Sequence, residues 1–533
     1  MAELVEPRRR FWYGAVAGLL AAAVALAVGE LVAGLVRPES APVSAVGSGL
    51  IRLAPEQVKD FAIRSFGTHD KAVLVGGVLV VLAVLAAGLG VLADRRRWIG
   101  YAGIGLLGVV GVVAALAQAG AGVADVLPSL LGAAAGAGTL ALLLRRSDEM
   151  DIASGTERRR FLGFAVGSAV VAGLAGLGGR ALQTQRFAAS RSRAAVRIPR
   201  PATPAPALPA GVDLKVPGAA PWRTGNTGFY RVDTALSVPQ LTADSWRLQI
   251  HGKVDNPLSI TYHELLRMPL IERDITLCCV SNPVGGPYIG NARWIGAPLR
   301  EVLRRAGVHA DANQIVSRSS DGMTLGTPTA VATDGRAAML AVAMNGAPLP
   351  VDHGFPVRML VPGLYGYVSA CKWIVDIELT TFAAYDAYWV PRGYSAQAPV
   401  KTESRIDTPR DGANPKAGAI QIAGVAWAQH RGISKVEVQV DDGPWQEARL
   451  AAVPSADTWR QWVRTWQATP GDHRIRVRAT DATGATQPAR QTPVYPNGAT
   501  GYHEIHVSVP RGRSPRRSDG GRTRSRRRPR GSR

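Results

Sequence analysis

The stretch DITLCCVSNP, residues 274–283, places two cysteines side by side in a chain of 533 residues that contains three cysteines. A thiolate is the form of cysteine that acts as a nucleophile or binds a soft metal ion. A disulfide between neighbours would be strained, and the third cysteine, Cys371, is distant in the sequence. Because the pair lacks the spacings of zinc and covalent-haem motifs, the residues alone favour a buried, inert pair over a reactive one.

Five apolar segments occupy the first 180 residues, and each approaches the roughly 20 residues that a helix needs to cross a bilayer. Charged residues are almost absent inside them. We therefore predict an N-terminal region, residues 1–187, with about five transmembrane helices in contact with membrane lipid. The segments are 11–36, 73–93, 98–119, 123–144 and 161–179.

Arginine clusters orient these spans. They lie at 8–10, 95–97, 145–146 and 158–160, which places all of them on one side of the membrane if the spans alternate. The side with more arginine and lysine is the cytoplasmic side. We therefore expect a multi-pass protein of the cytoplasmic membrane whose chain after the fifth span lies outside the cytoplasm.

The segment 156–179 also resembles a twin-arginine export signal, because Arg158 and Arg159 precede a weakly hydrophobic run rich in glycine and alanine. An ordinary helix with positive flanks is the alternative. Twin-arginine export carries folded proteins, so this route would suit a domain that acquires a cofactor in the cytoplasm.

The rest of the chain divides by composition. Residues 188–221 are rich in proline and alanine, which predicts a stiff linker. Residues 222–400 mix short β-rich runs with helix-like stretches, which is typical of an α+β domain. Residues 401–510 alternate like the strands of an all-β Ig-like sandwich. Residues 511–533 hold eleven arginines and no apolar residue, which predicts disorder. Because no aromatic residue is interleaved with these arginines, we expect a solvated tail and no nucleic-acid partner; attraction to anionic lipid or nucleic acid is the alternative.

Longer motifs surround the second cysteine and follow it in a fixed order. They are CVSNPVGGPYIGNARWIGAPLREVLRRAG, AMNGAPLPVDHGFPVRMLVPGLYGYVSACKW and AYWVPRGYS. In this order and spacing they resemble the sulfite oxidase family of molybdopterin-dependent oxidoreductases, most closely its bacterial membrane-anchored members, over residues 222–510. The resemblance implies a sulfite-oxidase-like α+β molybdopterin domain and a molybdenum–molybdopterin cofactor.

The resemblance assigns Cys279 as the thiolate ligand of molybdenum, because it opens the C-x-x-N element that Asn282 closes. Alternation along a strand would point Cys278 to the opposite face, into the core. Tyr394 takes the place of an active-site tyrosine, Arg231 is a second catalytic candidate, and Trp294 would line the pocket. For the pterin and its phosphate the resemblance implies Tyr230, Arg231, Asp233, Asn282, Asp321, His353, Arg358 and Lys372.

The substrate pocket departs from that of the animal enzymes, in which arginines follow the C-x-x-N element. Here residues 283–286 are Pro-Val-Gly-Gly and carry no charge. A pocket without these cations would hold the sulfite dianion weakly, although Arg231 and Arg392 remain candidate anion binders. Sulfite is therefore disfavoured as substrate without being excluded.

None of the five spans contains a histidine, so we expect no bis-histidine haem in this chain. Electrons would then pass through a separate protein or a small carrier. The sequence predicts a membrane-anchored molybdopterin-dependent oxidoreductase that transfers an oxygen atom on a small-molecule substrate outside the cytoplasmic membrane. The alternatives are a sulfite dehydrogenase and a non-enzymatic membrane-tethered binding or scaffold protein with an Ig-like domain. The resemblance also allows a homodimer through the C-terminal domain.

Overall fold

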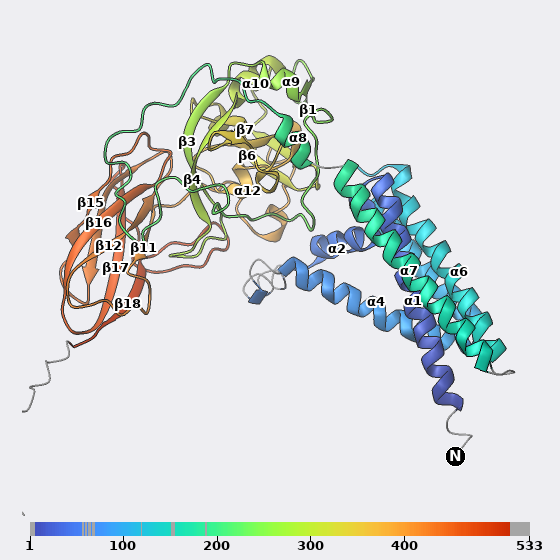
Figure 1. The fold of residues 1–533 in the computed structure, drawn as a ribbon. Coiled ribbons are helices and arrows are strands. Elements are labelled where there is room, and N and C mark those ends of the chain that lie inside the picture. Colours follow the sequence, from blue (N-terminus) through green and yellow to red (C-terminus); the bar gives the residue numbers. More distant parts are fainter. Residues whose placement is uncertain are drawn as a thin grey trace, which may run out of the picture.

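The computed structural model describes residues 6–55, 58, 61, 65–66, 70–118, 120–150, 155–186 and 189–511. Figure 1 shows a helical part and two β-rich parts that together form an arch. The side chains of the arginine pair at 158–159 and the basic tail from residue 512 onward lie outside the described residues.

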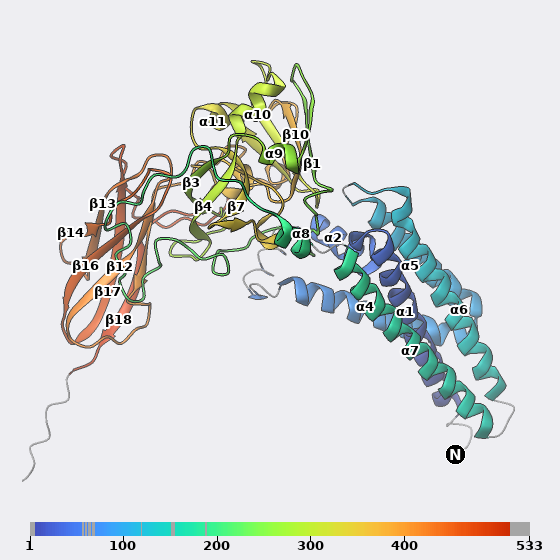
Figure 2. The same cartoon turned by 45° about the horizontal axis from the view of Figure 1, so that its top comes forward.

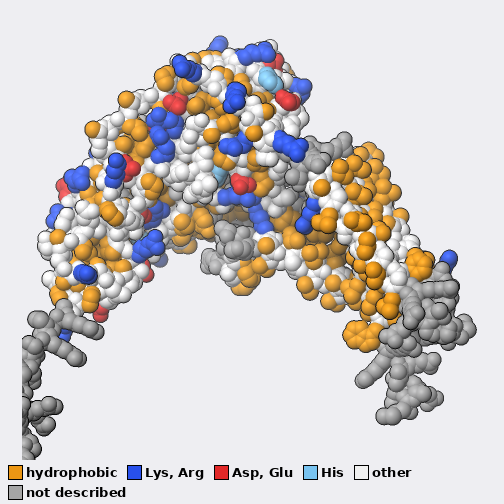
Figure 3. Space-filling view, in the orientation of Figure 1, with side chains coloured by type: hydrophobic (Ala, Val, Ile, Leu, Met, Phe, Trp, Pro, Cys, Tyr) orange, Lys and Arg blue, Asp and Glu red, His pale blue; other side chains and the backbone are white. Residues whose placement is uncertain are grey.

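Five long helices make up the helical part, and each contains a segment long and apolar enough to cross a membrane. Hydrophobic side chains cover the surface of this part (Figure 3), as expected for helices that face lipid. A short helix, α2 (Pro42–Leu53), follows the first long one. The long helices are α1 (Glu6–Leu35), α4 (Asp70–Arg95), α5 (Arg97–Leu116), α6 (Leu127–Met150) and α7 (Gly155–Arg186).

Small residues bring α1 and α4 into close contact. A Cβ atom placed on Gly18 of α1 would clash with the carbonyl oxygen of Ala86, and one on Gly90 of α4 would clash with the carbonyl oxygen of Gly14. Small residues four apart are typical of helix crossings in membranes. The crossing lies in the C-terminal half of α4, and Figure 1 shows the other half diverging from the bundle toward the β-rich parts.

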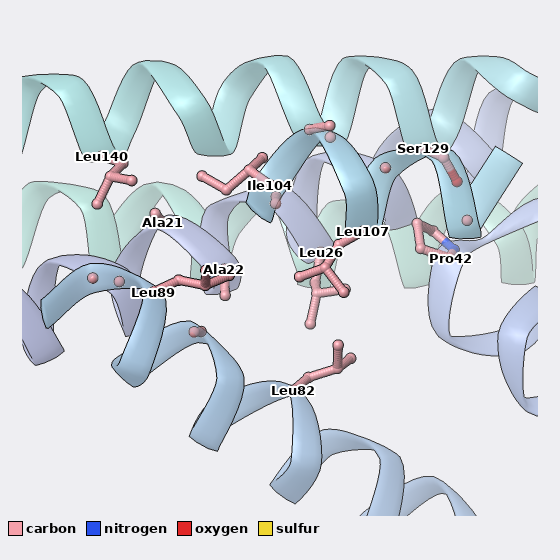
Figure 4. A pocket seen from close by; sticks show the side chains of 18 residues that line it. Ala21, Ala22, Leu26, Pro42, Leu82, Leu89, Ile104, Leu107, Ser129 and Leu140 are labelled. Atoms are coloured by element: carbon pink, nitrogen blue, oxygen red, sulfur yellow. The ribbon is translucent and has the colours of Figure 1, made fainter. Parts of the chain in front are cut away.

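A cavity of about 100 Å³ remains where α1, α4, α5 and α6 meet. Leu26, Leu82 and Ile104 lie around it (Figure 4). Ser129 is the one polar side chain in its described lining. We assign this cavity to imperfect packing of apolar helices, because it offers almost no polar group for chemistry.

Two five-stranded sheets build the central β-rich part. The first has the strand order β2-β1-β10-β5-β6, and in the second β3-β4-β7-β8 are consecutive neighbours while β9 pairs with β7. Four short helices accompany them: α9 (Tyr262–Leu266), α10 (Leu299–Ala306), α11 (Thr329–Thr333) and α12 (Gly366–Ser369). The strands are β1 (Arg247–Gly252), β2 (Leu258–Thr261), β3 (Ile271–Cys278), β4 (Ile289–Pro298), β5 (Gln314–Ser319), β6 (Thr324–Pro328), β7 (Met339–Met344), β8 (Ala347–Pro348), β9 (Arg358–Leu360) and β10 (Ile374–Thr380).

The C-terminal β-rich part consists of two four-stranded antiparallel sheets with the orders β11-β12-β16-β15 and β14-β13-β17-β18. Ile422 and Trp462 of one sheet share a core with Val436 and Val477 of the other. Alternation of apolar and polar residues explains this arrangement, because one face of each sheet is buried. The strands are β11 (Glu403–Thr408), β12 (Gly418–Trp427), β13 (Ile433–Val440), β14 (Gln446–Glu447), β15 (Arg449–Leu450), β16 (Arg460–Ala468), β17 (Gly471–Asp481) and β18 (His503–Val509).

The C-terminal part is hydrogen-bonded to strand β3 of the central part. The Trp459 N–H donates to Thr276 Oγ1 over 2.8 Å, and the Thr276 N–H donates to the carbonyl oxygen of Asp457 over 2.9 Å. Arg405 donates to the carbonyl oxygen of Gly286, in the loop after β3, over 2.8 Å. Because β3 ends at Cys278, these contacts help to position the cysteine pair.

The segment 188–221 does not stand free as a spacer. Its first described residues form the short helix α8 (Ala189–Ala195). Further along, the Leu214 N–H donates to Gln461 Oε1 over 2.7 Å, and the Ala220 N–H donates to Asp407 Oδ2 over 2.9 Å. Earlier in the segment, Thr203 pairs with Ile271 of β3. The segment therefore lies against both β-rich parts, where its backbone groups find partners.

Candidate active site

A cavity of about 580 Å³ lies between the central part and the first helices. Both central sheets contribute to its lining, through residues that follow β3 and β5, begin β9 and precede β10. The cavity brings together seven residues that the sequence singled out: Tyr230, Asp233, Cys279, Asp321, Arg358, Lys372 and Tyr394.

The two adjacent cysteines have different surroundings. Cys278 ends β3, is 2% exposed and packs in the central core, whereas Cys279 lines the cavity. A tight loop begins at Cys279, because its N–H donates to the carbonyl oxygen of Tyr288 over 2.9 Å and its own carbonyl oxygen accepts from the Asn282 N–H over 3.1 Å. The loop thus presents one thiol of the pair to the cavity.

Electrostatics also distinguish the two thiols. Burial raises the pKa of Cys279 above its usual value, and hydrogen bonds from the backbone and side chain of Ser281, with the charge of Lys372, oppose this rise. Burial raises the pKa of Cys278 well above its usual value, the charge of Glu403 raises it further, and the charge of Arg405 opposes the rise. Hydrogen bonds that favour the thiolate therefore lower the pKa of Cys279 but not that of Cys278.

Asp233 is the centre of a buried ion-pair network. Its carboxylate lies 2.7 Å from Lys372 Nζ, 2.8 Å from Arg231 Nε and 2.6 Å from Lys71 Nζ of α4. Burial alone would raise the pKa of Asp233, but these cations hold it well below its usual range. Burial lowers the pKa of Lys372 to about 8, against the opposing effect of Asp233. The network fixes the lysine ammonium at the cavity wall.

Arg358 brings a second buried cation to the cavity. Its side chain is 6% exposed, its Nη1 donates to the carbonyl oxygen of His353 over 3.4 Å, and its guanidinium lies 5.6 Å from the centre of the Trp294 ring. Its Nε is buried and has no hydrogen-bond partner within the described chain. Ser319 also lines the cavity, and its Oγ is likewise buried without a hydrogen-bond partner within the described chain. Unpaired buried donors of this kind are rare in folded proteins.

Aromatic side chains and one carboxylate complete the lining. Tyr394 is 6% exposed, and its ring contacts those of Trp389 and Tyr367 edge-on at 5.2 and 5.6 Å. Burial and the neighbouring Cys279 raise the pKa of Tyr230, so its hydroxyl stays protonated and can donate. Asp321 accepts from the Met323 N–H over 3.2 Å through one carboxylate oxygen.

Three of the predicted residues lie off the cavity lining. Arg231 is half-exposed and pairs with Asp233. Asn282 holds the loop after Cys279, since its Oδ1 accepts from the Tyr288 N–H over 2.7 Å. His353 Nε2 donates to the carbonyl oxygen of Asn226 over 3.0 Å, and burial lowers the pKa of His353 to about 4, so the ring is neutral near pH 7.

The expectation that Trp294 lines the pocket is wrong. Its indole is fully buried in the core, where Nε1 donates to the carbonyl oxygen of Ile275 over 3.2 Å. Arg392 also does not line the cavity: its Nη1 donates to the carbonyl oxygen of Tyr388 and its Nη2 to that of Arg52, over 3.2 Å. Neither residue is therefore placed to contact a group in the cavity.

The structure adds lining residues that sequence reasoning missed. Cys371 precedes Lys372 and lines the cavity, and burial raises the pKa of its thiol to about 12, so it stays protonated. Leu50 and Ile51 of α2 and Lys71 and Leu74 of α4 form another wall. Hydropathy predicts α4 as a span but carries no signal for this long-range contact. Among the described residues, no group of three or more His, Cys, Asp and Glu side chains is placed to hold a metal ion.

Comparisons with known proteins bear on the same residues. A family model described as an oxidoreductase molybdopterin binding domain matches residues 235–389, which include Cys279, Asp321, Arg358 and Lys372. The mitochondrial sulfite oxidase of Mus musculus is 31% identical over 326 residues, which are 51% of this chain and 59% of the mouse protein. The chain thus spans somewhat more than half the length of that relative.

Two further proteins are similar to this chain. The uncharacterized oxidoreductase YuiH of Bacillus subtilis (strain 168) is 31% identical over 149 residues, which are 28% of this chain and 72% of that protein. The crystal structure of the sulfane dehydrogenase SoxCD from Paracoccus pantotrophus matches with a TM-score of 0.45 and 23% identity, over 51% of this chain and 80% of that one.

Proposed function

Because the chain belongs to the sulfite oxidase family of molybdopterin-dependent oxidoreductases, we propose that it is a molybdenum-dependent enzyme that transfers an oxygen atom to or from a small substrate. The observation that carries the proposal is the position of Cys279, which lines a cavity of about 580 Å³ together with two buried cations. When bound, molybdenum–molybdopterin supplies the two-electron redox chemistry of this transfer.

The donors around the cavity fit such a cofactor. Cys279 provides the soft sulfur that molybdenum requires. Arg358 and Lys372 provide positive charge for a phosphate group, and Arg can do so through two parallel hydrogen bonds. The buried donor Arg358 Nε has no partner within the described chain, and a polar group in the cavity would satisfy it.

Each remaining residue then has a specific task. Tyr230, Asp233 and Asp321 would hold the pterin by hydrogen bonds from the cavity wall. Tyr394 would orient the substrate through its hydroxyl. Arg231, Asn282 and His353 are positioning residues: Arg231 pairs with Asp233, Asn282 holds the loop after Cys279, and the His353 carbonyl accepts from Arg358.

A sulfite dehydrogenase is the second candidate, because the mouse relative is a sulfite oxidase. Arg358 and Lys372 would serve an anion as well as a phosphate, but residues 283–286 after the C-x-x-N element carry no charge. We therefore favour a small neutral oxygen-atom donor or acceptor, such as a sulfoxide or an N-oxide, over the sulfite dianion.

Metal analysis and turnover test the proposal together. The full chain, produced with ample molybdate, should contain stoichiometric molybdenum and turn over with artificial dyes and one of sulfite, a sulfoxide or an N-oxide. Turnover with sulfite but with neither a sulfoxide nor an N-oxide would identify the protein as a sulfite dehydrogenase. Protein that binds no molybdenum under these conditions would instead support a membrane-tethered scaffold.

We further propose that the five apolar helices cross the cytoplasmic membrane, with the N-terminus inside and residues 222–510 outside. The arginine clusters at 8–10, 95–97, 145–146 and 158–160 support this orientation. A reporter that is active only in the cytoplasm, fused after residue 510, should be silent. Reporter activity there would contradict the five-span topology.

The C-terminal sheets are proposed to be an Ig-like domain that forms a homodimer. Their two-layer arrangement around one core supports this class. Light scattering of the detergent-solubilised chain should give twice the mass of one protomer. A single-chain mass across a range of protein concentrations would rule the dimer out.

A further inference from the structure

The candidate active-site cavity has two chemically different sets of lining residues. One set includes Cys279, Arg358 and Lys372, which the proposed function assigns to the cofactor. The other set is largely apolar and comes from the helical part, namely from Leu50 of α2 and Leu74 of α4 and their neighbours. We call this second set the apolar wall, and it joins the cavity to helices that are long and apolar enough to cross a membrane.

The apolar wall is continuous with the surface of the helical part. A span begins at Lys71, so Leu74 lies in its first turn. Leu53 and Val58, which also line the cavity, are 84% and 55% exposed. Exposed apolar side chains of this size are costly in water and suit contact with lipid. Figures 1 and 2 show α2 and the start of α4 close to the central β-rich part.

Ion pairing keeps this wall in place. Lys71 Nζ at the start of α4 lies 2.6 Å from Asp233, whose carboxylate also pairs with Lys372 over 2.7 Å. Lys71 donates as well to the carbonyl oxygen of Ala235. The membrane-facing wall and the cofactor-facing wall are therefore joined through one carboxylate.

We infer that the apolar wall of this cavity admits a lipid-soluble quinone from the membrane, which exchanges two electrons with the cofactor site; the inference rests on the proposed function. The reaction balances as X + H₂O + quinone ⇌ XO + hydroquinone. In the forward direction water supplies the oxygen atom and the two protons, and X supplies the two electrons that reduce the quinone. In the reverse direction the hydroquinone supplies the two electrons and two protons, and the oxygen atom of XO leaves as water.

The lining suits a flat ring with two oxygens and an apolar tail. Ser319 Oγ is buried, lines the cavity and has no partner within the described chain, so it can donate to a quinone oxygen. Trp389 and Tyr394, whose rings lie 5.2 Å apart, also line the cavity and offer aromatic surface. Leu50, Leu74 and the exposed Leu53 then provide a surface along which an isoprenoid tail extends into lipid.

Photolabelling tests this site directly. The full chain in phosphatidylcholine liposomes is irradiated with an azido-quinone that carries an isoprenoid tail, and labelled peptides are identified by mass spectrometry. Labels are expected in α2, in the first turn of α4 and around Trp389. Leu74→Asn should reduce this labelling by about fivefold, because it places an amide against the ring and tail. Val73→Asn is the matched control, since Val73 is adjacent, 44% exposed and outside the cavity lining.

Competition experiments distinguish a specific quinone site from a crevice that binds any lipid. Excess unlabelled quinone should abolish the labelling, whereas a fatty acid of similar length should not. Equal competition by the fatty acid, equal labelling of wild type and Leu74→Asn, or labels confined to the lipid-facing surfaces of α5–α7 would each overturn the inference. Molybdenum content and dye-linked turnover of the same preparation test the proposed function separately. If both are intact without cavity labelling, only the quinone site is refuted.

Discussion

Acid should weaken the central fold through His353. This side chain is 5% exposed, its Nε2 donates to the Asn226 carbonyl oxygen, and burial lowers its pKa from 6.5 to about 4. Between these two values the unfolded chain binds a proton at His353 that the folded chain does not bind. The free energy of unfolding therefore falls as the pH falls from 6.5 to 4.

The size of this effect follows from the two pKa values. One pKa unit corresponds to about 1.4 kcal/mol, so the difference between 6.5 and about 4 amounts to about 3 kcal/mol in full. About 2 kcal/mol of it is lost between pH 7 and pH 4.5. For a domain of 150–250 residues this corresponds to a decrease in Tm of roughly 4–8 °C.

His353→Gln isolates this contribution, because glutamine can still donate to Asn226 but does not titrate. Near-UV circular dichroism of the detergent-solubilised full chain gives Tm at pH 7 and pH 4.5. The decrease in Tm of the variant should be smaller than that of the wild type by roughly 4–8 °C. An equal decrease in both proteins would refute the reasoning.

His473→Gln provides a control of opposite sign. Burial lowers the pKa of His473, but the hydrogen bond to Asp441 raises it, and the net pKa lies above its usual value of 6.5. The stability that His473 contributes is therefore present below pH 6.5 and is lost as the pH rises through its folded pKa. This variant should be less stable than the wild type at pH 5.

Four other variants test the site and the membrane part. Cys279→Ser should retain molybdenum but lose turnover and alter the sulfur-to-metal absorption. Cys278→Ser should keep its turnover and lose about 1–3 kcal/mol of stability. The reverse result would assign the ligand to Cys278. Lys71→Met leaves Asp233 with its other two cations, so we expect a loss of about 1 kcal/mol in thermal melts, and an unchanged Tm would show that the pair contributes nothing. Replacing Arg158 and Arg159 by lysine should reduce export of the catalytic part in cell fractionation, and normal export would identify α7 as an ordinary span.

Local patterns in the sequence predict much of this molecule. Hydropathy alone locates five apolar helices, because a bilayer imposes the same length and polarity on each span. Alternation along a strand separates Cys279 from Cys278, and the two side chains do have different surroundings, one at the cavity and one in the core. Both inferences depend on residues close together in the chain.

Features that depend on distant contacts were missed or misplaced. Trp294 is near Cys279 in sequence, yet the pairing of β4 between β3 and β7 places its ring in the core. Lys71 pairs with Asp233 across 162 positions of sequence, and no local pattern marks that contact. Family likeness could identify His353 as a candidate, but only tertiary packing shows its hydrogen bond to Asn226.

The contact between β3 and the C-terminal sheets has a consequence for the timing of assembly. Thr276 in β3 accepts from the Trp459 N–H, 183 positions later in the chain. During synthesis the N-terminal helices emerge first and can enter a membrane long before this partner exists. The loop on which Cys279 lies therefore reaches its final support only when nearly the whole chain has left the ribosome. Cofactor loading accordingly belongs to the last stage of folding, and a chain released before residue 457 would carry its thiol on a strand without that support.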